Sequence, residues 1–229
     1  LYMLGIREWN LDSMMFTYVW SPFKWLGKQL QFLHSKFISA FLILTAIVLL
    51  LLGYAYPGII SSTGGILPVI LMGIALAVIL FAFSCRQSAL QAWVYLLTGN
   101  LFIMVAVLYN APHINPIEII FYASGVLIAF LIGYYYLQKI NAIDRDISLD
   151  KFHGYVYEQE NTGLLFLFAA IGMLGFPVTA AFIGIDVLFT YVHSNQVVLI
   201  IGMALSLIFL ELSAFRIFLR IFMGPHKKL

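Results

Sequence analysis

The sequence predicts an all-α integral membrane protein with about six transmembrane helices, one of them broken, and an interfacial amphipathic helix near the N-terminus. Of the 229 residues, 63% are hydrophobic and only 10% are charged, whereas about 25% charge is usual in soluble domains. The mean hydropathy is +1.00. A bilayer is the solvent that suits this composition, because a spanning helix needs about 20 mostly apolar residues.

Charge and cysteine content exclude several other classes of protein. The net charge of +2 is too small to indicate a nucleic-acid partner. A single cysteine, Cys85, excludes an internal disulfide and any cysteine cluster for zinc or an iron–sulfur centre. No histidine lies within a predicted span, which argues against a membrane haem with two histidine ligands. The sequence therefore predicts no cofactor and no metal, with membrane lipid as the surroundings.

Residues 1–36 form a predicted cytoplasmic and interfacial segment. They lack the short apolar core and small-residue cleavage site of a signal peptide. Ser21-Pro22 is typical of a helix start. The apolar residues that follow recur at helical spacing: Phe23, Leu26, Leu30 and Leu33. The pattern predicts an amphipathic helix with Trp20 and Trp25 at headgroup level, and both a simple membrane anchor and a helix that docks a partner fit it.

Residues 37–137 form the predicted four-helix membrane region. Its apolar stretches are residues 37–56, 65–84, 88–109 and 116–137. The link 85–87 is so short that the second and third spans must be antiparallel neighbours. Asn115 is the expected N-cap of the fourth span, with Pro116 at its first position and Glu118 placed to complete a capping-box-like pair.

Residues 138–162 lose this hydrophobicity and are predicted to form a cytoplasmic loop. The region 163–229 then carries a C-terminal helix pair. Its first apolar stretch, 163–192, would be about 45 Å long as one helix, against a hydrocarbon core of about 30 Å. Gly172, Gly175 and Pro177 lie in the middle of it, and proline removes a backbone donor. We therefore predict a broken helix, followed by a last span over about 196–215.

The distribution of basic residues predicts the orientation. All 12 lysines and arginines lie in the N-terminal segment, the second and fourth links and the C-terminal end, and the other three links have none. Because lysine and arginine are enriched on the cytoplasmic side, both termini and the 138–162 loop are predicted to face the cytoplasm. The expected location is the cell inner (cytoplasmic) membrane.

Three ionisable residues lie in or beside the last two spans: Asp186, Glu211 and Arg216. Inside a span such a side chain costs about 2.5 kcal/mol or more by insertion scales, so each is a candidate for ion translocation. Asp186 follows the predicted break, where freed carbonyl groups can bind a cation or water beside the carboxylate. Alternatively, Asp186 is simply hydrated near the outer mouth. Arg216 is expected to snorkel to the interface, whereas Glu211 lies deeper and needs a partner from another helix.

Three motifs in residues 149–229 resemble the C-terminal part of the antiporter-like subunits of respiratory complex I and of Mrp-type cation/proton antiporters. The first is the short loop motif Leu-Asp-Lys-Phe-His-Gly at 149–154, which includes Lys151, His153 and Gly154. The second is residues 175–188, with glycine, proline, phenylalanine and then an aspartate. The third is the phenylalanine-arginine and glycine pattern at 215–224. Ile185 stands where the family usually has lysine or glutamate before the aspartate.

The resemblance implies a proton-translocating membrane subunit, as a partial or divergent copy. The nearest likeness is to the membrane subunit of DAB-type inorganic-carbon transporters, which partners a large cytoplasmic protein that resembles a zinc carbonic anhydrase. The expected partners are thus other membrane subunits, including the missing antiporter half, and a large cytoplasmic zinc protein.

Two other functions remain open from the residues. The first is a purely structural subunit of such a complex, which the scarcity of ionisable residues in the spans favours. The second is an intramembrane enzyme acting on lipid. That enzyme would have to use the cytoplasmic cluster of Lys151, His153 and Glu158.

Overall fold

The computed structural model describes residues 17–18, 21–29, 35–56, 65–111, 113–177 and 179–225, and all regular secondary structure within them is helical. The α-helices are α3 (Ser21–Gln29), α4 (Lys36–Ala55), α6 (Ile66–Ser84), α7 (Ala89–Asn110), α8 (Pro116–Asp144), α9 (Glu160–Met173), α10 (Ala180–Thr190) and α11 (Val197–Phe222). Five of them, α4, α6, α7, α8 and α11, are long and apolar enough to cross a membrane. The prediction of an all-α, multi-pass membrane protein is confirmed for the described part of the chain.

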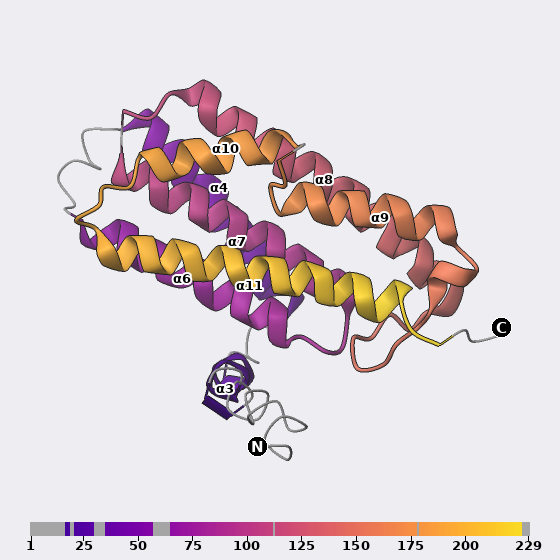
Figure 1. Cartoon of the computed structure of the whole chain (residues 1–229). Helices are drawn as coiled ribbons and strands as arrows, with labels where there is room; N and C mark the ends of the chain where they lie inside the picture. The colour runs from indigo at the N-terminus through magenta and orange to yellow at the C-terminus, as the bar shows by residue number, and fades with distance from the viewer. Residues whose placement is uncertain are drawn as a thin grey trace, which may run out of the picture.

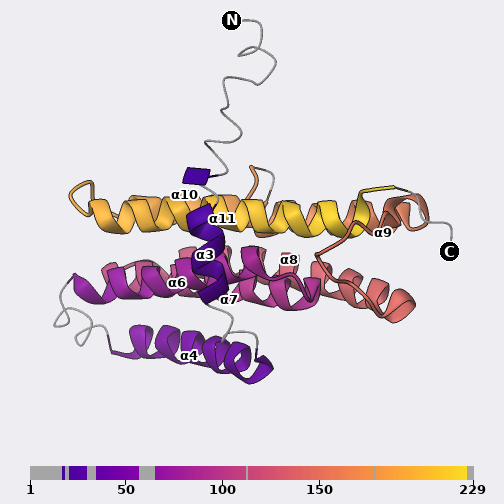
Figure 2. The same ribbon diagram turned by 90° about the horizontal axis from the view of Figure 1, so that it is seen from below.

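The long helices lie lengthwise beside one another in layers (Figure 1). Figure 2 shows α9, α10 and α11 in one layer, α6, α7 and α8 in the next, and α4 alone beyond them. The central helix is α7, which contacts α4, α6, α8 and α11 and is buried along most of its length. Its large side chains, among them Trp93, Tyr95 and Phe102, fill the middle of the bundle.

Two helices continue beyond the apolar stretches that predicted them. The stretches end at residues 137 and 215, whereas α8 reaches Asp144 and α11 reaches Phe222. Hydropathy marks where apolar residues stop, but the helix continues for as long as its backbone hydrogen bonds and one packed face persist. Ile140, for example, is fully buried within the polar end of α8. The loop between α8 and α9 is correspondingly shorter than predicted.

The amphipathic helix predicted near the N-terminus corresponds to α3. It lies crosswise to the long helices in both views (Figures 1 and 2) and contacts α6. The rings of Phe23 and Phe209 lie 4.5 Å apart, so Phe23 packs against α11 as well. Trp25 is exposed, whereas Trp20, Leu30 and Leu33 lie outside the described residues.

The predicted topology can be tested by labelling with a membrane-impermeant thiol reagent. Ser194, in the link from α10 to α11, and Glu158, in the loop before α9, are exposed at opposite ends of the bundle (Figure 1). We expect Ser194→Cys to react from outside intact cells and Glu158→Cys to react only after lysis. Cys85 is 5% exposed and should give little background. The reverse pattern would overturn the orientation.

Candidate functional site

The predicted helix break lies between α9 and α10. Gly175 has a φ of +65°, in the left-handed region that glycine adopts without steric cost. Pro177 has no N–H and so cannot continue the helical ladder, while the Thr179 N–H donates to the Phe176 carbonyl (2.8 Å) and closes a turn around it. Gly172 belongs to the last turn of α9. The break therefore comes from Gly175 and Pro177.

Both halves of the broken helix pack against α8, and α10 approaches it backbone to backbone. A Cβ atom added to Gly184 would lie 2.6 Å from the Cα of Tyr122. One added to Gly125 would lie 2.4 Å from the backbone nitrogen of Ala181. Such close approach through small residues is how helices associate in lipid, where no hydrophobic force drives them together. The two glycines thus fix the start of α10 on α8.

A buried polar pair lies next to the break. The Tyr122 hydroxyl donates to Oδ1 of Asn100 at 2.6 Å, and Nδ2 of Asn100 donates to the Leu96 carbonyl at 2.9 Å. The same Nδ2 lies 3.6 Å from Sδ of Met173, the last residue of α9. Tyr122 and Asn100 are each no more than 1% exposed. The pair provides hydrogen-bonding groups in an otherwise apolar part of the bundle, beside the interrupted backbone.

Asp186 is exposed on α10, one turn before the helix ends. It makes no hydrogen bond or ion pair within the described residues. Ile185 is the side chain that reaches the break, since its Cδ1 lies 2.4 Å from where a Cβ on Gly175 would be. The structure thus brings Ile185, and not Asp186, to the unwound backbone. The Asp186 carboxylate faces away from the bundle, toward lipid, water or another subunit.

Glu211 is exposed on α11, among apolar side chains. Arg216, five residues further on, is partly buried and donates from Nη1 to the Phe83 carbonyl at the end of α6. Arg216 marks the level at which α6 ends. Glu211 precedes it by five residues, which is a rise of about 7.5 Å along α11, so Glu211 lies that much further into the bundle. No described residue pairs with its carboxylate.

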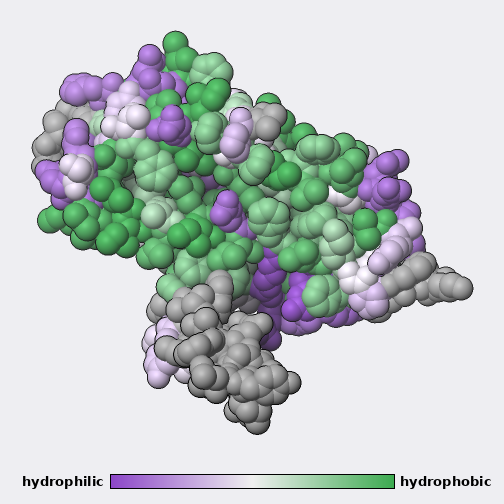
Figure 3. All heavy atoms as spheres, viewed as in Figure 1, coloured by the Kyte–Doolittle hydropathy of each residue, from purple (hydrophilic) through white to green (hydrophobic). Residues whose placement is uncertain are grey.

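In Figure 3 polar residues gather toward the ends of the bundle, with isolated polar spots within the apolar surface between them.

The loop motif folds back on itself before α9. Lys151 Nζ donates to Asp146, and this hydrogen bond holds the pKa of the Asp146 carboxyl well below its usual range. His153 is buried and its Nε2 donates to the Ser148 carbonyl at 2.8 Å. Two of the three side chains that a lipid-acting enzyme would need, Lys151 and His153, are therefore engaged within the loop, while Glu158 is exposed.

The same motif is attached to the end of α11. The His153 N–H donates to the Arg220 carbonyl at 2.9 Å. Gly154 has a φ of +73°, and a Cβ there would lie 2.6 Å from the Pro225 carbonyl oxygen. The Tyr155 hydroxyl donates to Asp144 at the end of α8, and burial together with this bond raises the pKa of Tyr155. The motif, together with Tyr155 directly after it, thus connects the ends of α8 and α11.

A second polar cluster lies at the other end of the bundle. The Tyr191 hydroxyl donates to Oε2 of Glu118 at 2.6 Å, while Asn110 and Gln196 exchange two side-chain hydrogen bonds of 3.0 and 2.7 Å. Asn115 caps α8 as predicted, by accepting from the Ile117 N–H. Glu118, which the sequence placed in that cap, contacts the link after α10 instead.

Sequence reasoning missed the partners of these polar residues because each pair joins different helices. No motif links Tyr122 to Asn100, or Tyr191 to Glu118, and only packing brings them together.

Among the described residues, no three histidine, cysteine, aspartate or glutamate side chains converge to hold a metal ion. Comparison of the chain with protein-family models, curated proteins and solved structures found no match.

Proposed function

We propose that the chain is an antiporter-like subunit of a larger ion-coupled membrane complex. In this role it takes part in proton or cation translocation that drives transport or redox coupling, of which inorganic-carbon uptake is one form. The observation that carries the proposal is the break between α9 and α10, packed against α8 within an apolar bundle. Broken helices in transporters provide backbone groups at membrane depth for binding ions.

The polar groups around this break support a path for ions rather than a rigid joint alone. The Tyr122–Asn100 pair lies beside Met173 and supplies a buried hydroxyl and a buried amide near the break. The Tyr155–Asp144 and Tyr191–Glu118 hydrogen bonds hold further polar groups at the two ends of α8. The unwound backbone itself meets an apolar side chain, Ile185 against Gly175, so the remaining ionisable groups of a relay have to come from elsewhere.

The exposed carboxylates indicate where those groups come from. Asp186 and Glu211 face outward from apolar helices. A carboxylate left in lipid costs several kcal/mol, and adjacent protein that supplies a donor or a cation removes most of this penalty. We infer that neighbouring membrane subunits cover both residues, and that the chain acts together with them.

Purification from native membranes in mild detergent tests this proposal. At least one further membrane subunit should copurify, and the assembled complex in liposomes should move protons or cations while the isolated chain does not. A chain that transports protons alone, or that purifies free of partners under all mild conditions, would contradict the proposal.

A substitution at Glu211 tests the contact itself. Glu211→Ala leaves a partner's donor or cation unpaired in a desolvated contact, so we expect recovery of the partner to fall roughly tenfold or more. Glu160→Ala, which removes the same charge from the exposed first turn of α9, is the matched control and should recover the partner normally. Equal recovery with both variants would place Glu211 outside the contact.

A further inference from the structure

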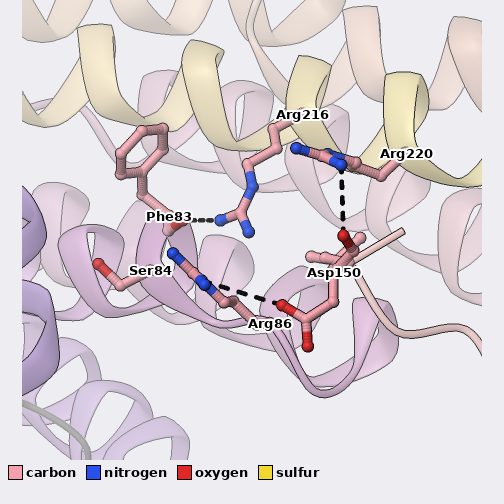
Figure 4. Close-up of a pocket in the computed structure, with 7 residues that line it drawn as sticks. Phe83, Ser84, Arg86, Asp150, Arg216 and Arg220 are labelled. Atoms are coloured by element: carbon pink, nitrogen blue, oxygen red, sulfur yellow. Dashed lines mark hydrogen bonds and ion pairs between the residues drawn. The ribbon is translucent and has the colours of Figure 1, made fainter. Parts of the chain in front are cut away.

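A cavity of about 220 Å³ lies where α6 and α11 end, at the side predicted to be cytoplasmic. Three arginines line it, Arg86, Arg216 and Arg220, together with Asp150, Phe83 and Ser84. Figure 4 shows the guanidinium groups converging on this space from the α6–α7 link and from two successive turns of α11. We call it the arginine pocket. Arg216 was considered above as an ion-translocation candidate, but the pocket that it forms with Arg86 and Arg220 was not.

The arginine pocket has more positive charge than its own carboxylate can balance. Arg86 Nε lies 3.9 Å from Oδ1 of Asp150, in a pair whose side chains are both more than half exposed. Arg220 Nη1 contacts only the Asp150 backbone carbonyl, at 3.4 Å, and its guanidinium lies over the Phe152 ring. Arg216 donates to the Phe83 carbonyl. Within the described residues, neither Arg216 nor Arg220 forms an ion pair.

We propose that the arginine pocket binds the phosphate group of an anionic phospholipid in the adjacent leaflet. Guanidinium groups present paired N–H donors that match phosphate oxygens, and such charge-assisted bonds are about twice as strong as neutral ones. Two arginines from one helix and a third from a neighbouring link place donors on more than one side of the cavity. A phosphate in the cavity would balance the positive charge of the arginines that Asp150 alone does not neutralise.

The surroundings favour a lipid headgroup over free phosphate. The walls are the ends of two long apolar helices, the level at which headgroups lie in a bilayer. Phe215 and Leu219, each directly before an arginine of the pocket, are 41% and 47% exposed and offer apolar surface to acyl chains. Basic pockets between helices on the cytoplasmic side are a recognised way of binding anionic headgroups.

Lipid titration of the full chain in detergent micelles tests this inference, with native mass spectrometry to count bound lipids. The probes are phosphatidylglycerol, phosphatidylcholine and inorganic phosphate. We expect one phosphatidylglycerol to be retained with much higher affinity than phosphatidylcholine, and inorganic phosphate at millimolar concentration not to displace it. Displacement by inorganic phosphate would show that the pocket takes the free ion and would overturn the lipid assignment.

Substitutions then locate the binding. Arg220→Gln should weaken phosphatidylglycerol binding about tenfold, as expected when one charge-assisted contact is lost. Arg145→Gln, which removes the same charge from an exposed position outside the pocket, should bind as the parent does. Arg220→Lys keeps the charge but not the paired donors, so its affinity for phosphatidylglycerol should lie between those of the other two variants. It replaces Arg220→Gln in the test if that variant does not fold. Equal affinity in Arg220→Gln and Arg145→Gln would mean diffuse attraction and would overturn the proposal.

Discussion

If Asp186 carries the translocated proton, Asp186→Asn should leave the complex assembled but reduce its ion-coupled activity by about 10²-fold. The variant keeps the size of the side chain and an oxygen that a donor from a neighbouring subunit can still reach, and it removes the titratable proton. Asp186 is exposed and has no partner within the described part of its own chain, so the change should alter the stability of the isolated chain by no more than about 0.5 kcal/mol. A loss of activity would therefore report the carboxylate and not the fold. The measurement is proton or cation flux by the reconstituted complex at matched expression.

Glu118→Gln is the control for that experiment. It removes a carboxylate at the same end of the bundle, and its amide oxygen can still accept from the Tyr191 hydroxyl. We expect this variant to retain activity. If Asp186→Asn and the parent have equal activity, Asp186 is only a hydrated residue near the end of its helix. If the variant fails to assemble, the chain is better described as a purely structural subunit.

Gly184→Ala should destabilise the bundle by about 1–3 kcal/mol, the range for overpacking, and lower its apparent melting temperature by about 5 °C. The added Cβ would lie 2.6 Å from the Cα of Tyr122, and a backbone atom cannot move aside by changing rotamer. Helix α10 would have to move off α8, away from the Tyr122–Asn100 pair. Thermal unfolding of the purified protein in detergent measures the effect.

Gly73→Ala provides the comparison for this effect. Gly73 lies within α6, and a Cβ there meets nothing within 4 Å. Replacing it should leave the melting temperature unchanged or raise it, because alanine favours a helix by up to about 1 kcal/mol over glycine. If Gly184→Ala has the same melting temperature as the parent, the close approach of α8 and α10 does not hold the break in place.

The parts of the fold that the sequence predicted well are those decided by local chemistry. Charge-free stretches placed α4 and α6 within about a residue of their observed bounds, since nothing but a spanning helix suits them. The break was predictable because Gly175 and Pro177 interrupt a helix whatever surrounds them. The far ends of α8 and α11 were not, because residues such as Ile140 are buried by tertiary contacts that hydropathy does not see.

The candidate site was predictable in its residues but not in its arrangement. The sequence singled out Asp186, Glu211 and Arg216 because charge is rare in apolar helices. It could not show that Asp186 faces outward while Ile185 reaches Gly175, because adjacent helical residues differ by about 100° in direction and the contacts of α10 decide which one is buried. The arginine pocket combines three separate segments, so no spacing in the sequence indicates it.

The isolated position of α4 has a consequence for how the protein is made. Its side chains are mostly exposed, and its main neighbour is α7, through the Tyr109 hydroxyl on the Leu49 carbonyl (3.1 Å) and a close approach at Gly53. Synthesis must cover the 55 residues from Tyr56 to Asn110 before that neighbour is complete, which takes roughly 3–11 s at about 5–20 residues per second. During this interval the newly inserted helix lacks the neighbour that covers it in the folded chain. Apart from Lys36 at its first position, α4 is uncharged and therefore stable in lipid, so it can enter the bilayer first and pack against α7 once that helix follows.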